Sequence, residues 1–207
     1  MQASTKIAAN TKSRGRPKQY DPEQAILAAM QVFWTKGLAA TSLDDLSTAM
    51  DMNRPSIYNA FGSKEVIYLR ALNTFCGQLD AALDGTLGQA AEFQLGLLSF
   101  YYQAIDVYCG PEAQLGCFLA CTAPVEVINH EGVSTALASL INDLDQKIAV
   151  YVRDAVASGS LAQPDEPMVI AKLIQGVLHT LALRARAGEP RIQLRKLARY
   201  SVKHFCR

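Results

Sequence analysis

The residues of this chain best suited to a defined chemistry lie between positions 41 and 65. Arg54, Ser56, Tyr58 and Asn59 place hydrogen-bonding groups at helical spacing within this stretch. Arginine can donate to guanine or to phosphate, serine and asparagine can bond bases or phosphates, and a tyrosine hydroxyl can reach a phosphate. These residue types suit the major groove of DNA better than they suit bulk solvent.

Two short helices joined by a tight turn are expected to position these side chains. Ser42 is the expected N-cap of the first helix, and Asp45, three residues later, can complete a capping box. The turn is Asp51-Met52-Asn53, and Asn53 can cap the second helix, residues 54–61. This order of elements is a helix-turn-helix, in which the second helix enters the major groove and the first braces against the DNA backbone.

Further helix signals flank this unit on both sides. Asp21-Pro22 is a helix start, and the supporting helix that follows is expected to end at Gly37. Gly62 ends the second helix of the pair, and Ser63 caps the next one. Lys64 therefore stands at a helix start, where its ammonium and the free backbone N–H groups offer a second phosphate site.

The remainder of the chain shows helical periodicity and no strand signal of any length. We expect six more helices, separated by glycine- and proline-containing breaks such as Gly85-Thr86. They are expected at residues 64–83, 89–109, 113–129, 134–157, 166–186 and 191–205. The predicted fold class is all-α, with nine helices.

Composition excludes several classes of protein. The chain has 207 residues, half of them hydrophobic, so it can bury a full core. Lys172, Gln175 and His179 interrupt its most apolar stretch, residues 169–183, and no signal peptide is visible, so we expect a soluble cytoplasmic protein without a membrane partner. The five cysteines form no CxxC pair and no zinc spacing, which predicts free thiols and no metal or cofactor.

The net charge of +1 hides a segregation of charge along the chain. Residues 1–64 carry 8 basic and 5 acidic side chains, residues 65–183 carry 4 and 13, and residues 184–207 carry 8 and 1. A basic first segment fits contact with nucleic acid, although solvated surfaces would give the same count. Residues 1–20 form a basic, flexible arm that either follows DNA or is a terminus without a role.

The chain resembles the TetR/AcrR family of transcriptional regulators. The resemblance rests on GRPK, AMQVFWTKGLAATSLDDL and NRPSIYNAFGSKEVIYLRAL, which cover residues 15–72 in unbroken register, and on GCFLACTAPVE at residues 116–126. It implies an Ω-shaped homodimer that binds a near-palindromic operator and is released by a small molecule. The expected division is the arm at 1–20, a helix-turn-helix domain at 21–65 and a ligand-binding and dimerisation domain at 66–207.

By the same resemblance, seven residues match the positions through which family members contact DNA: Ser42, Arg54, Pro55, Ser56, Tyr58, Asn59 and Lys64. Two positions depart from the family pattern. Asp51 stands where the turn usually has glycine, and Asp tolerates a left-handed backbone less well than Gly. Asp44 lies near the expected phosphate path, where a basic residue would be more helpful.

The last two helices are expected to form the dimer interface, because both have broad apolar faces that can pair across a two-fold axis. The predicted interface residues are Leu173, Val177, Leu181, Leu194, Leu197, Ser201 and Phe205. Arg191, Arg195 and Arg199 lie on the other side of the final helix. That side is either a solvated surface or a second DNA-binding patch.

Polar and aromatic residues of the middle helices are candidates for lining a mostly apolar effector pocket. They are Tyr101, Tyr102, Asp106, Tyr108, Cys117, Cys121, Glu126, Asn129, His130, Gln175 and His179. An alternative is a thiol sensor of oxidants or electrophiles that uses Cys117 or Cys121, although buried small hydrophobes explain both cysteines. A helical enzyme or a simple interaction protein would lack DNA binding, and the chain has no phosphate loop or nucleophile elbow.

Overall fold

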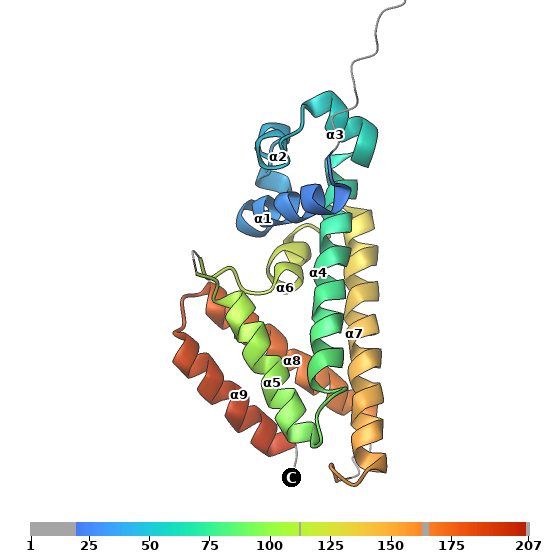
Figure 1. Ribbon diagram of the computed structural model, residues 1–207, viewed down its shortest axis with the longest axis vertical. Helices are drawn as coiled ribbons and strands as arrows, with labels where there is room; N and C mark the ends of the chain where they lie inside the picture. The colour runs from blue at the N-terminus through green and yellow to red at the C-terminus, as the bar shows by residue number, and fades with distance from the viewer. Residues whose placement is uncertain (1–19, 112, 163–165, 206–207) are drawn as a thin grey trace, which may run out of the picture.

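The computed structural model describes residues 20–111, 113–162 and 166–205, and these form nine α-helices and one short 3-10 helix with no strand among them (Figure 1). Residues 1–19 of the basic arm and Cys206 lie outside the described residues. The bounds of the helices are α1 Pro22–Ala40, α2 Leu43–Ala49, α3 Arg54–Phe61, α4 Lys64–Thr86, α5 Phe93–Tyr108, α6 Phe118–Thr122, η1 Ala123–Val125, α7 Glu131–Ala157, α8 Pro167–Arg186 and α9 Arg191–Phe205. The all-α prediction is confirmed.

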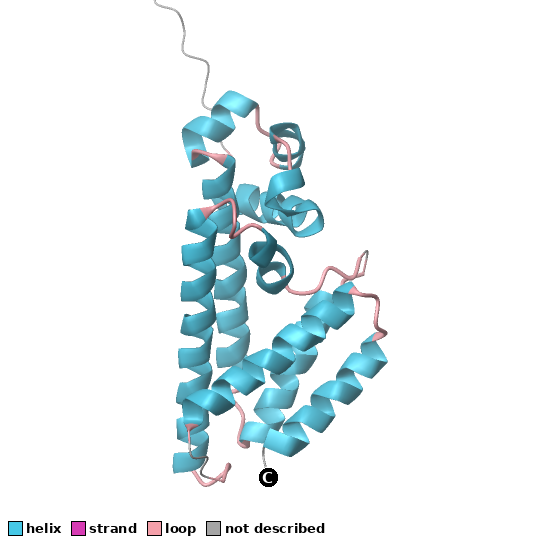
Figure 2. Ribbon diagram, turned by 180° about the vertical axis from the view of Figure 1, so that it is seen from behind, coloured by secondary structure: helices cyan, strands magenta, loops and turns pink. Residues whose placement is uncertain are grey.

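The helices are arranged in two tiers. Figure 1 shows α1, α2 and α3 at one end of the molecule and α5, α8 and α9 at the other. The long helices α4 and α7 run side by side along the molecule, and the view from behind in Figure 2 agrees. Helix α4 thus connects the helix-turn-helix end to the body.

A buried aromatic cluster joins α1 to the body. The Trp34 ring of α1 lies 5.1 Å from the Phe75 ring of α4 and 5.8 Å from the Phe118 ring of α6, centroid to centroid. The Tyr68 ring lies 5.5 Å from that of Phe118, and the Tyr68 hydroxyl is 2.6 Å from the Thr122 hydroxyl. Because offset and edge-on aromatic pairs stabilise beyond their burial, this cluster fastens α1 to α4 and α6.

Several predicted helix bounds were wrong. Helix α4 continues through the predicted break to Thr86, whose hydroxyl bonds to the Ala82 carbonyl inside the helix at 2.7 Å. Helix α5 begins at Phe93 rather than at residue 89, and α7 begins at Glu131 rather than at residue 134. The predicted helix at residues 113–129 is only the short α6 followed by η1, because Gly116 before α6 has a positive φ of 69° and Pro124 lies within η1.

One described helix, α8, has the length and apolar composition of a membrane span, with 39% of its most apolar window buried. This differs from our reading of residues 169–183 as too interrupted for one. Core helices of globular proteins have the same composition, and α8 packs against α5, α7 and α9. Composition alone is therefore weak support for a membrane role.

Candidate DNA-binding surface

Helix α2 starts with the predicted capping box. The Ser42 hydroxyl oxygen accepts from the Asp45 backbone N–H at 3.1 Å, and the Asp45 carboxylate accepts from the Ser42 N–H at 2.9 Å. Lys36 of α1 donates to the same carboxylate at 2.7 Å. These hydrogen bonds, that from Lys36 first, lower the pKa of Asp45 to about 2, so the cap is charged at neutral pH and tied to α1.

The turn between α2 and α3 is set by side-chain hydrogen bonds and one left-handed residue. The Ser47 hydroxyl donates to the Met52 carbonyl. The Met52 backbone N–H donates in turn to the Ser47 carbonyl at 3.1 Å. Asp51 has φ 49°, and it is the sole described non-glycine residue with a positive φ. Asn53 caps α3 by accepting from the Ser56 N–H at 2.9 Å. The turn and its cap are confirmed as predicted.

Helix α3 is anchored by one side and open on the other. Ile57 and Phe61 are buried, so the helix cannot rotate without exposing them. Tyr58 is half exposed, and the neighbouring predicted contact residues, Arg54, Pro55 and Asn59, are also exposed. The buried pair therefore turns these polar side chains outward together.

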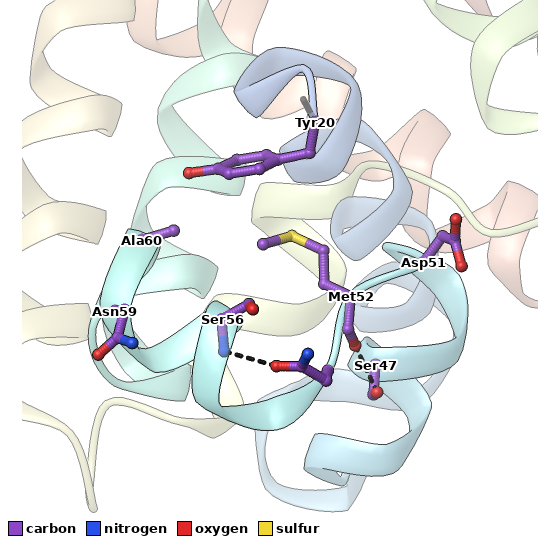
Figure 3. Close-up of a pocket in the computed structure, with 8 residues that line it drawn as sticks. Tyr20, Ser47, Asp51, Met52, Ser56, Asn59 and Ala60 are labelled. Atoms are coloured by element: carbon purple, nitrogen blue, oxygen red, sulfur yellow. Dashed lines mark hydrogen bonds between the residues drawn. The ribbon is translucent and has the colours of Figure 1, made fainter. Parts of the chain in front are cut away.

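A hollow of about 670 Å³ with a mixed polar and apolar lining lies beside α3 (Figure 3). Figure 3 shows Ser56 and Asn59 from α3 on one wall, with Tyr20 above and Met52 behind. Tyr20 precedes α1 and its ring lies 5.8 Å from that of Phe61, centroid to centroid. Tyr20 was not among the predicted site residues, although an aromatic residue directly before a helix N-cap is a sequence signal for such a contact.

Two of the predicted DNA contacts already bind groups within the chain. The Arg54 Nε donates to the Asp44 carboxylate of α2 at 2.7 Å, and this ion pair raises the pKa of Arg54. The ammonium of Lys64 donates to the carbonyl of Thr41 at 2.7 Å and to that of Ala39 at 3.4 Å. Lys64 therefore joins the start of α4 to the end of α1, and its phosphate contact stays a prediction.

The candidates for an effector pocket do not converge on one cavity. Tyr101 is buried and donates to the Ile174 carbonyl at 2.9 Å, while the Gln175 amide donates to the Ile141 carbonyl at 3.4 Å. Asp106 is exposed and accepts from Arg195 of α9 at 2.8 Å. The remaining candidates are scattered: half-buried Tyr102, Cys121, His130 and His179, exposed Asn129, and buried Tyr108, Cys117 and Glu126.

Glu126, one of these candidates, instead joins the body to the helix-turn-helix end. Its buried carboxylate accepts from the Ala39 N–H at 3.0 Å, just beyond Gly37, where the φ of 79° interrupts α1 as predicted. His130 Nε2 lies 4.0 Å from the same carboxylate, and His130 Nδ1 lies 3.0 Å from that of Glu65 in α4. This chain of contacts spans η1, α1 and α4.

The predicted dimer interface needs correction at two positions. Leu181 of α8 and Leu194 of α9 are fully buried inside the chain, because the sides of the two helices that carry them face neighbouring helices of the body. Leu173 is about half exposed at 49%, Val177, Leu197 and Ser201 are half-buried, and the Phe205 side chain lies outside what the structure describes. Leu173 and its half-buried neighbours remain the predicted contacts with a second chain.

Two of the three arginines on the basic side of α9 are paired with α5. Arg191 donates to the Cys109 carbonyl at 2.6 Å and lies 3.4 Å from the Asp106 carboxylate. Arg195 binds the same carboxylate and stacks over the Tyr102 ring at 5.1 Å from the centroid. The side chains of Arg191 and Arg195 remain 47% and 39% exposed, in agreement with the expected solvated surface, and a DNA patch on this side of α9 stays a prediction.

The described cysteines, Cys76, Cys109, Cys117 and Cys121, are free thiols, as predicted. Burial raises the pKa of Cys76 to about 12 and that of Cys117 to about 11, and it also raises those of Cys109 and Cys121. Since the thiolate is the reactive form, this environment disfavours the thiol-sensor hypothesis. No group of three or more His, Cys, Asp or Glu side chains in the described part of the chain is placed to hold a metal ion.

The fold and this surface define a class: a helix-turn-helix protein whose α3 presents polar side chains on a buried anchor. The family profile described as "Bacterial regulatory proteins, tetR family" matches residues 25–71. The repressor ComR of Escherichia coli K12 is 24% identical over 188 residues, covering 90% of each chain, and the repressor BdcR of the same organism is 44% identical over 63 residues, covering 30% of this chain and 32% of BdcR.

A solved structure agrees with these relatives. A cysteine-substituted form of the TetR family regulator CifR, in complex with a 26 bp double-stranded operator DNA, is 28% identical with a TM-score of 0.81. The match covers 91% of this chain and 98% of that one. The profile match at residues 25–71, together with these relatives, supports the assignment of a TetR family transcriptional regulator.

Proposed function

We propose that this protein is a homodimeric repressor that binds a near-palindromic operator through α3 and is released by a small molecule. The observation that carries the proposal is the pairing of buried Ile57 and Phe61 with outward Arg54, Tyr58 and Asn59 on one short, capped helix. Relatives named as repressors and a relative bound to operator DNA support it. A DNA-binding role implies a cytoplasmic protein that is not an enzyme.

Dimerisation supplies the geometry that one helix lacks. Two copies of α3 must reach successive major grooves, about 34 Å apart, to bind both halves of a palindrome. The residues proposed to hold the copies together are Leu173, Val177, Leu197 and Ser201 on α8 and α9. An effector that shifts the separation of the two α3 helices weakens both half-sites at once.

Selection of bound sequences from a random DNA library tests this function. The expected product is a two-fold related consensus whose affinity falls steeply with salt. Tyr58→Ala should weaken binding to that consensus about tenfold, while Val150→Ala, a similarly exposed residue of α7, should not. Enrichment of no sequence, or of an asymmetric one by a monomer, would reject the proposal.

Arg54 and Asp44 refine the same experiment. If Arg54 reads a base, Arg54→Ala should relax the preference at one position of the consensus by about 1–3 kcal/mol. If it contacts a phosphate, the variant should bind all sequences more weakly and show a smaller salt slope. Asp44→Asn removes the carboxylate that holds the guanidinium in the free protein, so a change in base preference would show that this ion pair orients Arg54 on DNA.

A further inference from the structure

Two adjoining hollows lie where α1 faces α4 and α5. The smaller, of about 100 Å³, lies between α4 and α5 and has an apolar lining that includes Phe75, Phe100 and Ala104. The larger, of about 880 Å³, is bounded by α1, α4, α5 and the segment that follows α5. Gln78 and Val107 line both, so the two hollows adjoin at these residues.

The described side chains that line this space are all uncharged. The polar ones are glutamines, Thr35, and the aromatic residues Trp34 and Tyr108. Moving a charged ligand from water into such a space would cost several kcal/mol without a compensating partner. The lining therefore selects against carboxylates, phosphates and ammonium groups, and it favours a largely apolar molecule.

Trp34 also takes part in the lining of this space. It lines the larger hollow, and its side chain is largely buried. Its indole N–H is buried, with no acceptor among the described residues and no surface exposed toward the hollow. The contact that Trp34 offers a ligand is therefore apolar.

The size of the space bounds the ligand. A dry cavity of about 150 Å³ holds one benzene molecule, so the smaller hollow admits a short alkyl group or part of a ring. The remainder of such a ligand would lie in the larger hollow, against Leu27, Met30 and Trp34 of α1. The ligand would contact α1 directly, and α1 packs on α2.

We propose that these two adjoining hollows are the effector site, and that the effector is an uncharged, largely apolar molecule. The inference rests on the proposed function, because it assigns the site and the class of the small molecule that releases DNA. Its position differs from the pocket expected on the middle helices. The bound molecule contacts α1 as well as α4 and α5, so it acts on the position of α1, and with it the helix-turn-helix, relative to the body.

Tryptophan fluorescence reports on this space directly, because Trp34 is the single tryptophan of the chain. Three probes share one brominated ring: para-bromobenzyl alcohol, para-bromobenzoate and para-bromobenzylammonium. Bromine quenches the indole on contact. We expect saturable quenching by the alcohol, at concentrations about tenfold below any seen with either charged probe. Equal or tighter binding of a charged probe, or quenching by the alcohol that never saturates, would overturn the proposal.

A matched pair of variants tests whether the alcohol binds in these hollows. Val107 is 52% exposed, so Val107→Lys should fold while setting a charge where the two hollows meet. Leu95 is on the same helix, is 60% exposed and lines neither hollow. Val107→Lys should weaken quenching by the alcohol about tenfold, and Leu95→Lys should leave it unchanged. Equal effects of the two substitutions would move the site elsewhere and reject the inference.

Operator binding separates this inference from the proposed function. Addition of the alcohol to the protein–operator complex should release DNA from the parent protein and from Leu95→Lys, but not from Val107→Lys. Saturable quenching without any change in operator affinity would reject the effector site while the regulator function stands. Failure to select any operator would reject the proposed function instead, and the effector assignment with it.

Discussion

The helix-turn-helix unit and the body of the molecule differ in the sequence separation of the residues whose contacts stabilise each of them. The unit is held by hydrogen bonds between residues close in sequence, such as Ser42 with Asp45 and Asn53 with Ser56. The body is held by contacts such as those of Tyr101 with Ile174 and Asp106 with Arg195, which are 73 and 89 residues apart. The unit is thus suited to move as one rigid piece, and the body to change its packing around a ligand.

Several contacts join these regions, and two of them allow the comparison to be tested by substitution. One is the aromatic contact of Trp34 with Phe118, and the other is the hydrogen bond from the Ala39 N–H to Glu126. Ala39, the residue that bonds to Glu126, is only three residues before Ser42, the N-cap of α2. Loss of either contact should affect both regions.

The largest effect is expected from Phe118→Ala. Phe118 is fully buried against Trp34, Tyr68 and Phe75, so its removal should lower the free energy of unfolding by about 3–5 kcal/mol. Urea unfolding measures the loss, and the Trp34 emission should shift to the red. Phe93→Ala, a buried ring on α5, is the control and should destabilise without that shift. An unshifted emission in Phe118→Ala would mean that α1 is not fastened through this ring.

Glu126→Ala is expected to have the next largest effect. The substitution removes the part-buried hydrogen bond from the Ala39 N–H to a charged acceptor, which should cost about 1.5–3 kcal/mol of unfolding free energy. Glu126→Gln keeps an acceptor oxygen at nearly the same place and should lose less. Equal stability of the parent and the alanine variant in urea would show that the two regions are not joined at this point.

Asp51→Gly should change stability in the other direction. Asp51 has φ 49° in the turn, a conformation that glycine adopts at lower cost, so unfolding free energy should rise by up to ~1 kcal/mol. Asp51→Ala keeps the Cβ and should show no gain. Calorimetric melting compares the variants, and a lower melting temperature for glycine would show that the Asp51 side chain supports the turn.

The smallest effect is a dependence on pH confined to the helix-turn-helix unit. Because folding lowers the pKa of Asp45 to about 2, its carboxylate contributes stability above its ordinary pKa of about 3.9 and loses that contribution as the pH falls toward 2. Asp45→Asn should therefore flatten the stability profile in this window. Lys36→Met removes the main donor to this carboxylate and should flatten it in part, whereas an unchanged profile in both variants would contradict the assignment.

Prediction from sequence succeeded where partners are close along the chain. The capping box, the turn, the cap at Asn53 and the exposed face of α3 all follow from residue types three to five positions apart. Prediction failed at residues 113–129, where an apolar run resembled a helix but the chain is largely non-helical. It also failed for Asp106, whose partners on α9 could not be identified from spacing.

The sequence by itself determined the class of fold, the helix-turn-helix and the exposed side of α3, because caps, breaks and the anchors Ile57 and Phe61 act locally. Only the tertiary structure decided the roles of polar residues in the body. A carboxylate such as that of Glu126 takes its role from the donor that packing brings to it, and that donor is 87 residues away. For the same reason, the uncharged space beside Trp34 arises from α1, α4 and α5 together and appears in none of them alone.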